Sequence, residues 1–225
     1  MFEERPAALR QRVQELATKA TETGQPSDWF ETLYQESNGD TQQIPWAKLT
    51  PHPYLSEWLE HQAIRGNGKT ALVVGCGLGD DAEALAALGF TVTAFDVAPS
   101  AIAWCQQRFP DSSVQYQVAD LFALPDSWHQ VFDLVVEIRD IQALPLSVRA
   151  EAIQSVASTV APAGALFLVT RIRPMEDTPE GPPWPLSESE LHQFQSWGLV
   201  EQRRDVFSVS EQPVVTQIRM VLQRS

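Results

Sequence analysis

Three closely spaced glycines could bind a ligand through the backbone. Gly75, Gly77 and Gly79 follow the apolar run at residues 71–74 and precede an alanine-rich helical pattern. A glycine turn between a strand and a helix lets the main chain approach a ligand closely, because glycine has no side chain. The stretch therefore predicts a site for a nucleotide-like ligand.

The spacing and charge of this turn argue against a dinucleotide. Dinucleotide-binding turns follow the pattern G-x-G-x-x-G, and Asp80 stands where the third glycine would be. With Asp81 beside it, this carboxylate would lie where a pyrophosphate must bind, and like charges repel at that distance. We therefore expect a ligand without phosphate, with an NAD-dependent oxidoreductase as the alternative.

Two further acids follow the next two predicted strands. Asp96 can accept hydrogen bonds from both ribose hydroxyls, and Asp120 can accept one from an adenine amino group. Leu121 and Phe122 would then lie against the adenine ring. The carboxyl ends of neighbouring parallel strands form one crevice, which S-adenosylmethionine, a cation without phosphate, would fit. Taken singly, each acid could instead be a helix cap or a turn residue.

The elements that must position these residues alternate along the chain. Strands are predicted at residues 70–75, 91–96, 113–118, 131–136 and 164–170, with helices at about 79–88, 99–108 and 146–160. This alternation predicts an α/β fold with a parallel sheet and right-handed crossovers. A capping box at residues 187–190 opens a helix through Trp197. Strand-like runs near 200–209 and 214–223 can then pair as an antiparallel hairpin.

The first 52 residues precede the alternating region. Apolar residues at helical spacing predict an amphipathic helix over residues 6–21, which either packs on the core or covers a ligand cleft. Residues 24–53 are aromatic, irregular and rich in proline, as in a binding loop. We expect an N-terminal helix and aromatic lid over residues 1–52. One compact domain over residues 53–225 would follow, starting with a helix at 53–61.

Composition excludes several classes of protein. The 225 residues are 44% hydrophobic, enough for one sizeable core, and the net charge of −13 argues against binding nucleic acid. Two cysteines favour a reduced, cytoplasmic compartment. No segment reaches the length of a membrane span, and residues 1–5 are not typical of a signal peptide. The four histidines lack metal-ligand spacing, so no metal is expected.

Together, the glycine turn, Asp96 and Asp120 resemble a class I S-adenosylmethionine-dependent methyltransferase over residues 53–223. The resemblance implies a doubly wound, Rossmann-like sheet of seven strands, mostly parallel, with helices on both faces and the last strand antiparallel. It also implies S-adenosylmethionine as the cofactor. The predicted cofactor contacts are Trp46, Gly75, Cys76, Gly77, Gly79, Asp81, Asp96, Val97, Asp120, Leu121, Phe122 and Glu137.

One departure from the common pattern narrows the resemblance. Val73 stands where most class I enzymes have an acid, two positions before the first glycine. With the aromatic residues Phe30 and Tyr34 and the sequence Gly-Pro-Pro-Trp at 181–184, this resembles the thiopurine, thiol and halide methyltransferase branch. There the N-terminal aromatics fold over the cofactor and the late proline loop borders the acceptor. The implied acceptor is a small molecule, with a thiol or another soft nucleophile favoured.

Residues 137–142 follow the fourth predicted strand, and this part of the fold faces the transferred methyl group. Arg139 could hold an anionic substrate and Asp140 could act as a base, or Arg139 could pair with a carboxylate that shapes the loop. Arg171 and Arg173 are secondary candidates. A thiol ionises with little help, whereas a hydroxyl or an amine more often needs a base. An O- or N-methyltransferase of a small metabolite and a non-catalytic cofactor-binding protein remain alternatives, each as a monomer or homodimer.

Overall fold

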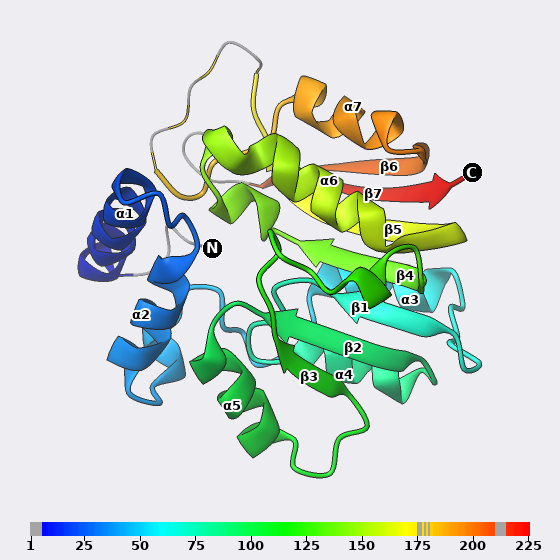
Figure 1. Cartoon of the computed structure of the whole chain (residues 1–225), viewed down its shortest axis with the longest axis horizontal. Coiled ribbons are helices and arrows are strands. Elements are labelled where there is room, and N and C mark those ends of the chain that lie inside the picture. Colours follow the sequence, from blue (N-terminus) through cyan, green and yellow to red (C-terminus); the bar gives the residue numbers. More distant parts are fainter. Residues whose placement is uncertain (1–5, 175–176, 178, 180, 210–214) are drawn as a thin grey trace.

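A seven-stranded sheet forms the centre of the protein, in the order β3-β2-β1-β4-β5-β7-β6 (Figure 1). The computed structural model describes residues 6–174, 177, 179, 181–209 and 215–225. Strand β7 pairs antiparallel with both β5 and β6, and the other neighbours pair in parallel. The strands are β1 (Thr70–Val73), β2 (Thr91–Asp96), β3 (Gln115–Val118), β4 (Phe132–Ile138), β5 (Val160–Ile172), β6 (Leu199–Val209) and β7 (Val215–Arg224).

This topology confirms the predicted doubly wound α/β sheet with its antiparallel C-terminal strand. The strand runs expected from the alternating pattern all occur, and β5 is longer than its predicted span. Residues 1–5, interpreted above as unlike a signal peptide, lie outside the described residues, as do residue 214 of the predicted last strand and residues 175, 176, 178 and 180 of the loop after β5.

Helices cover both faces of the sheet. Along β1, Ala71 and Val73 point to one face and Leu72 to the other, which follows from the two-residue period of a strand. One face packs against α3 (Pro53–His61), α4 (Asp80–Ala87) and α5 (Pro99–Arg108). The other packs against α6 (Arg149–Thr159) and α7 (Glu188–Ser196). No helix in the described part of the chain is long and apolar enough to cross a membrane.

The N-terminal segment is more regular than expected. It contains α1 (Ala7–Glu22), which confirms the predicted amphipathic helix, and α2 (Asp28–Ser37), which was not predicted. The interpretation of residues 24–53 as an irregular loop is therefore wrong for residues 28–37. Trp29, Leu33 and Ser37 recur at intervals of four and are buried on one helical face. Pro26 and Pro45 lie outside this helix, and their presence on both sides made the segment resemble an irregular loop.

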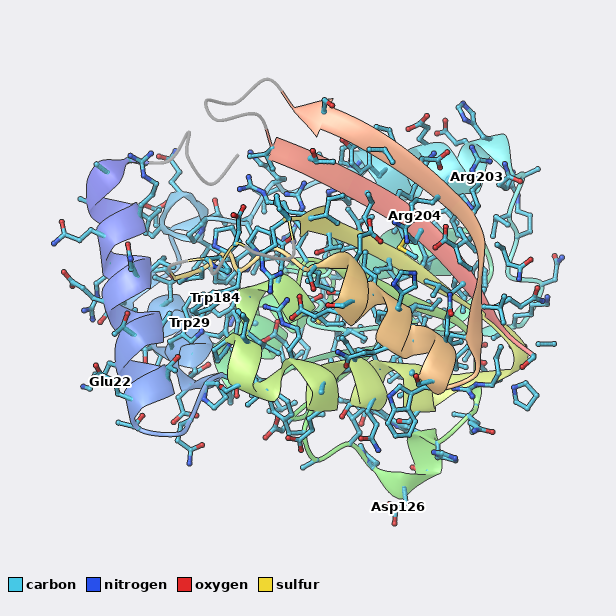
Figure 2. All side chains as sticks on the ribbon, turned by 90° about the horizontal axis from the view of Figure 1, so that it is seen from above. Glu22, Trp29, Asp126, Trp184, Arg203 and Arg204 are labelled. Atoms are coloured by element: carbon cyan, nitrogen blue, oxygen red, sulfur yellow. The ribbon has the colours of Figure 1, made fainter. Side chains whose placement is uncertain are left out.

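Helices α1 and α2 lie beyond the carboxyl ends of the parallel strands. In Figure 1 the arrowheads of β2 and β4 point toward these two helices. A third apolar cluster joins residues of α1 and α2 to Leu78, Ala98 and Trp184. Figure 2 shows Trp29 and Trp184 close together beside α1. The N-terminal segment and the late proline loop thus meet over the end of the sheet where parallel α/β folds bind ligands.

Candidate functional site

A cavity of about 480 Å³ lies at the carboxyl ends of the central strands. Its size is typical of sites for small molecules. The glycine turn after β1, the acid that ends β2 and the turn after β4 form its wall, together with Val13 of α1 and the late proline loop at residues 182–183. The segments that the sequence pattern singled out therefore converge on one site.

The glycine turn forms one wall of the cavity. Gly75, Gly77 and Gly79 have φ values of +52°, +54° and +89°, a region that favours glycine. A Cβ atom on Gly75 would lie 1.9 Å from Oδ1 of Asp140, and one on Gly77 would lie 3.6 Å from Cδ1 of Trp46. Cys76 completes this wall. Gly79 does not line the cavity; a Cβ on it would lie 2.5 Å from the hydroxyl of Tyr116.

Asp96 is held rigidly at the end of β2. Its carboxylate accepts hydrogen bonds from the backbone N–H of Gly77 at 3.0 Å and of Ala98 at 2.9 Å. The residue is 7% exposed and lines the cavity. Burial raises its pKa to about 6, against the opposing effect of these N–H donors. Asp96 is therefore a fixed carboxylate beside the glycine turn, as predicted for a ribose ligand.

The two acids that open α4 have different surroundings. Arg108 binds Asp80 through two hydrogen bonds of 2.8 and 2.9 Å, so this carboxylate is paired. Asp81 instead accepts a hydrogen bond of 2.6 Å from the backbone N–H of His52, and burial raises its pKa to about 6. Both acids line the cavity, but only Asp81 lacks a cationic partner among the described residues. The expected repulsion of phosphate thus depends mainly on Asp81.

The turn after β4 brings Arg139 and Asp140 into the cavity wall. The carboxyl group of Asp140 packs directly on Gly75, and burial together with nearby carboxylates raises its pKa well above the usual range. Arg139 adopts a φ of +72°, and its guanidinium donates a hydrogen bond of 2.5 Å to the amide oxygen of Gln217 on β7. The two candidate acceptor-side groups therefore point toward different parts of the sheet.

Glu137 lies behind this turn rather than in the cavity wall. It is fully buried and accepts hydrogen bonds from the backbone N–H groups of Asp140 at 2.6 Å and Ile141 at 2.9 Å. Burial raises its pKa to about 7. In this position Glu137 supports the residues that line the cavity instead of lining it itself.

The predicted adenine-binding residues lie next to the cavity but outside its wall. Asp120 is exposed, and its carboxylate accepts a hydrogen bond of 2.9 Å from the backbone N–H of Phe122. Leu121 is buried in the apolar cluster beneath α6, and Phe122 packs against that cluster. Val97 is half-buried and also lies outside the wall. The backbone N–H of Ala119, next to Asp120, donates a hydrogen bond of 3.1 Å to the carbonyl of Asp96, and contact of the four residues with adenine stays a prediction.

Aromatic side chains from the N-terminal segment form the part of the wall that lies beside Gly77. The ring of Trp46 lies 5.8–5.9 Å from those of Trp29, Phe30 and Tyr34, in edge-to-face arrangements. Its indole N–H donates a hydrogen bond of 2.8 Å to the hydroxyl of Tyr34. Trp29, Phe30 and Trp46 line the cavity. The faces of aromatic rings favour a cationic ligand, in agreement with the acids that line the same cavity.

Among the wall residues that sequence reasoning did not single out are His52 and Gln142, and it ranked Arg171 only as a secondary candidate. His52 is the N-cap of α3, a position that Pro53 at the first helical residue could have indicated. Gln142 accepts a hydrogen bond of 2.7 Å from the backbone N–H of Arg171, and both residues line the cavity. Arg173 does not line it; its guanidinium lies 3.2 Å from the carboxylate of Glu190.

Comparison with known proteins gives a consistent assignment. The family profile "Thiopurine S-methyltransferase (TPMT)" matches residues 35–221, from within α2 to within β7. The chain is 27% identical over 187 residues to "Probable thiol methyltransferase 2" of Arabidopsis thaliana, covering 78% of this chain and 80% of the relative. It is 31% identical over 121 residues to a "Ubiquinone biosynthesis O-methyltransferase" of Pseudomonas putida. That match covers 53% of this chain and 51% of the relative, about half of each.

Solved structures share the fold. The N-methyltransferase NodS from Bradyrhizobium japonicum, in complex with S-adenosyl-L-homocysteine, superposes with a TM-score of 0.66 at 21% identity, covering 87% of this chain and 97% of NodS. Magnesium protoporphyrin IX methyltransferase from Synechocystis PCC 6803 superposes with a TM-score of 0.66 at 17% sequence identity, covering 88% of this chain and 98% of that enzyme. With the family profile spanning most of the chain, the protein belongs to the thiopurine S-methyltransferase family of S-adenosylmethionine-dependent methyltransferases.

Proposed function

We propose that this enzyme transfers the methyl group of S-adenosylmethionine to a small thiol or another soft, anionic nucleophile. The observation that carries the proposal is the separation of charge in the cavity wall. Asp81, Asp96 and Asp140 lie on the side of β1 and β2, whereas Arg139 and Arg171 lie on the side of β5 and β7. Lys48, from the N-terminal segment, also lines the cavity. A cationic methyl donor, S-adenosylmethionine, and an anionic methyl acceptor would each bind beside charges of the opposite sign.

The acidic side would hold the cofactor. We assign Asp96 to the ribose hydroxyls, the glycine turn to the backbone contacts of the cofactor, and Trp46 to a face of the sulfonium or the adenine. Asp81 and Asp140 supply carboxylates near the positive groups of S-adenosylmethionine. Partly desolvated carboxylates interact more strongly with a cation than exposed ones do, because the local dielectric is lower.

The arginine side would hold the acceptor. Bound S-adenosylmethionine supplies an activated methyl group, so the chain mainly has to align the acceptor and exclude water. Arg139 and Arg171 would favour the ionised form of a thiol, whose pKa is ordinarily about 8.5. The aromatic residues of the N-terminal segment and the late proline loop would keep water from the reacting atoms.

An assay of the purified enzyme with S-adenosylmethionine tests this proposal. Sulfide, small thiols, halides and catechols are offered in parallel, and methylated products are identified by mass spectrometry. We expect turnover of sulfide or thiols. Arg139→Gln should raise the KM for a thiolate about tenfold, since a hydrogen bond to a charged partner contributes about 1.5–3 kcal/mol. Methylation of catechols with no turnover of thiols or halides would overturn the proposal.

A second candidate function is O-methylation of a small metabolite. The similarity to a ubiquinone biosynthesis O-methyltransferase over 121 residues favours it. Asp140 would then be the base, because its carboxyl group lies in the cavity wall beside the glycine turn, where it could accept a hydroxyl proton from the acceptor. Asp140→Asn should in that case abolish turnover of a hydroxyl acceptor, whereas a thiol acceptor should retain most of its rate.

A further inference from the structure

His52 is a polar side chain of the cavity wall to which the reaction described above gives no role. It lies between the glycine turn and the arginine side, since its backbone N–H bonds Asp81 and its ring lies near Arg139. Its edge contacts the ring of Tyr54, with centroids 5.2 Å apart. The imidazole is therefore held at the junction between the predicted cofactor and acceptor subsites.

The hydrogen bonds of His52 determine which ring nitrogen carries the proton. Nδ1 accepts a hydrogen bond of 3.3 Å from the backbone N–H of Tyr54, as the N-cap of α3. Burial and the neighbouring charge of Arg139 lower the pKa of His52 to about 3, so the ring is neutral near pH 7. A neutral imidazole whose Nδ1 accepts must carry its proton on Nε2.

Nε2 is buried and has no hydrogen-bond partner among the described residues. Leaving a buried donor unpaired is unfavourable, and such groups in native proteins usually serve a ligand or a water molecule. His52 cannot act as a base through Nε2, because that atom already carries the proton. Its remaining capacity is to donate one hydrogen bond.

We propose that the Nε2–H group of His52 donates a hydrogen bond to the methyl acceptor and, with Arg139, selects acceptors that present an anionic or lone-pair atom between them. This inference rests on the proposed arginine-side acceptor subsite and adds a residue that determines specificity. It requires an acceptor atom that can accept from two donors at once, as a thiolate or a halide ion can. An acceptor whose nearest atoms were only N–H groups would leave the Nε2–H group of His52 unpaired and is selected against.

Two substitutions separate this role from the capping role of His52. In His52→Asn the side-chain oxygen can replace Nδ1 as the cap of α3, since asparagine is a favoured N-cap, but the Nε2 donor is lost. His52→Gln retains an N–H donor near the position of Nε2. We expect His52→Asn to raise the KM for sulfide about tenfold with kcat, Tm and the affinity for S-adenosylhomocysteine nearly unchanged, and His52→Gln to recover part of the loss.

A spectroscopic titration tests the contact without turnover. Protein labelled with ¹⁵N-histidine and saturated with S-adenosylhomocysteine is titrated with sulfide and, in a separate experiment, with iodide. The signals of His52 are identified as those that are missing from the spectrum of the His52→Asn variant. We expect the Nε2–H tautomer and a saturable shift of the Nε2 resonance. No shift with an acceptor that the enzyme methylates, or an unchanged KM in His52→Asn, would overturn the inference. If thiols and halides are not methylated, the proposed function fails, and the titration with the acceptor that is methylated decides the role of His52.

Discussion

Replacing Asp96 with asparagine separates cofactor binding from folding. In the predicted complex the carboxylate accepts hydrogen bonds from both ribose hydroxyls, and bonds to a charged acceptor contribute about 1.5–3 kcal/mol each. The amide oxygen of asparagine can retain one weaker bond, so we expect a net loss of about 3 kcal/mol, or about 100-fold in Kd.

The same substitution should leave the stability of the ligand-free protein nearly unchanged. The pKa of Asp96 rises from 3.8 to about 6 on folding. Keeping this buried group ionised at neutral pH therefore costs up to ~3 kcal/mol, which a neutral amide avoids. Against this gain, the amide can accept from only one of the N–H groups of Gly77 and Ala98, and an unpaired buried donor costs about 1–3 kcal/mol.

Calorimetric titration with S-adenosylhomocysteine and denaturant unfolding measure the two effects. Asp133→Asn is a matched control, because Asp133 also accepts hydrogen bonds from a backbone N–H and a side chain, both of Thr70, but lies outside the cavity wall. Asp133→Asn should leave the Kd for S-adenosylhomocysteine unchanged. A folded Asp96→Asn variant with wild-type affinity would refute the placement of the ribose.

Three further perturbations have definite expected outcomes. Gly75→Ala should abolish binding of S-adenosylhomocysteine in calorimetry, because the new Cβ would lie 1.9 Å from Oδ1 of Asp140 at a φ of +52°; wild-type affinity would contradict this. Trp46→Ala should weaken that binding about tenfold by removing a cation–π face, and it should also lower Tm because Trp46 packs on Trp29, Phe30 and Tyr34; Tyr34→Phe, which removes only the hydrogen bond to Trp46, is the control, and an equal loss of affinity there would point to a structural role. As the pH rises from about 4 to 6, the unfolding free energy of the ligand-free protein should fall by up to ~3 kcal/mol for each of Asp81 and Asp96, because a raised pKa means that the folded state retains protons that the unfolded state releases. Denaturant unfolding at several pH values measures this decrease, and Asp96→Asn should reduce it; an identical curve for the variant would show that Asp96 is not its source.

Local patterns in the sequence predicted most of the fold. The apolar runs, the capping box at Ser187 and Pro99 at the start of α5 depend on residues a few positions apart, so they could be recognised without a structure. Helix α2 was not predicted from the sequence, and the reason is informative. Its apolar face is made of Trp29, Leu33 and Tyr34 in a segment bordered by prolines, and only packing against α1 and the glycine turn shows that these residues form one face.

The sequence by itself determined the ligand-binding turn, the sheet and the family, because each is encoded by short-range spacing. Tertiary structure decided which side chains form the site. It placed Glu137 behind the wall, left Asp120 exposed, and paired Asp80 with Arg108, 28 residues away. It also brought His52 and Arg171 into the wall from segments far apart in the sequence. Burial and long-range pairing depend on how helices and strands pack together, and no local pattern specifies them.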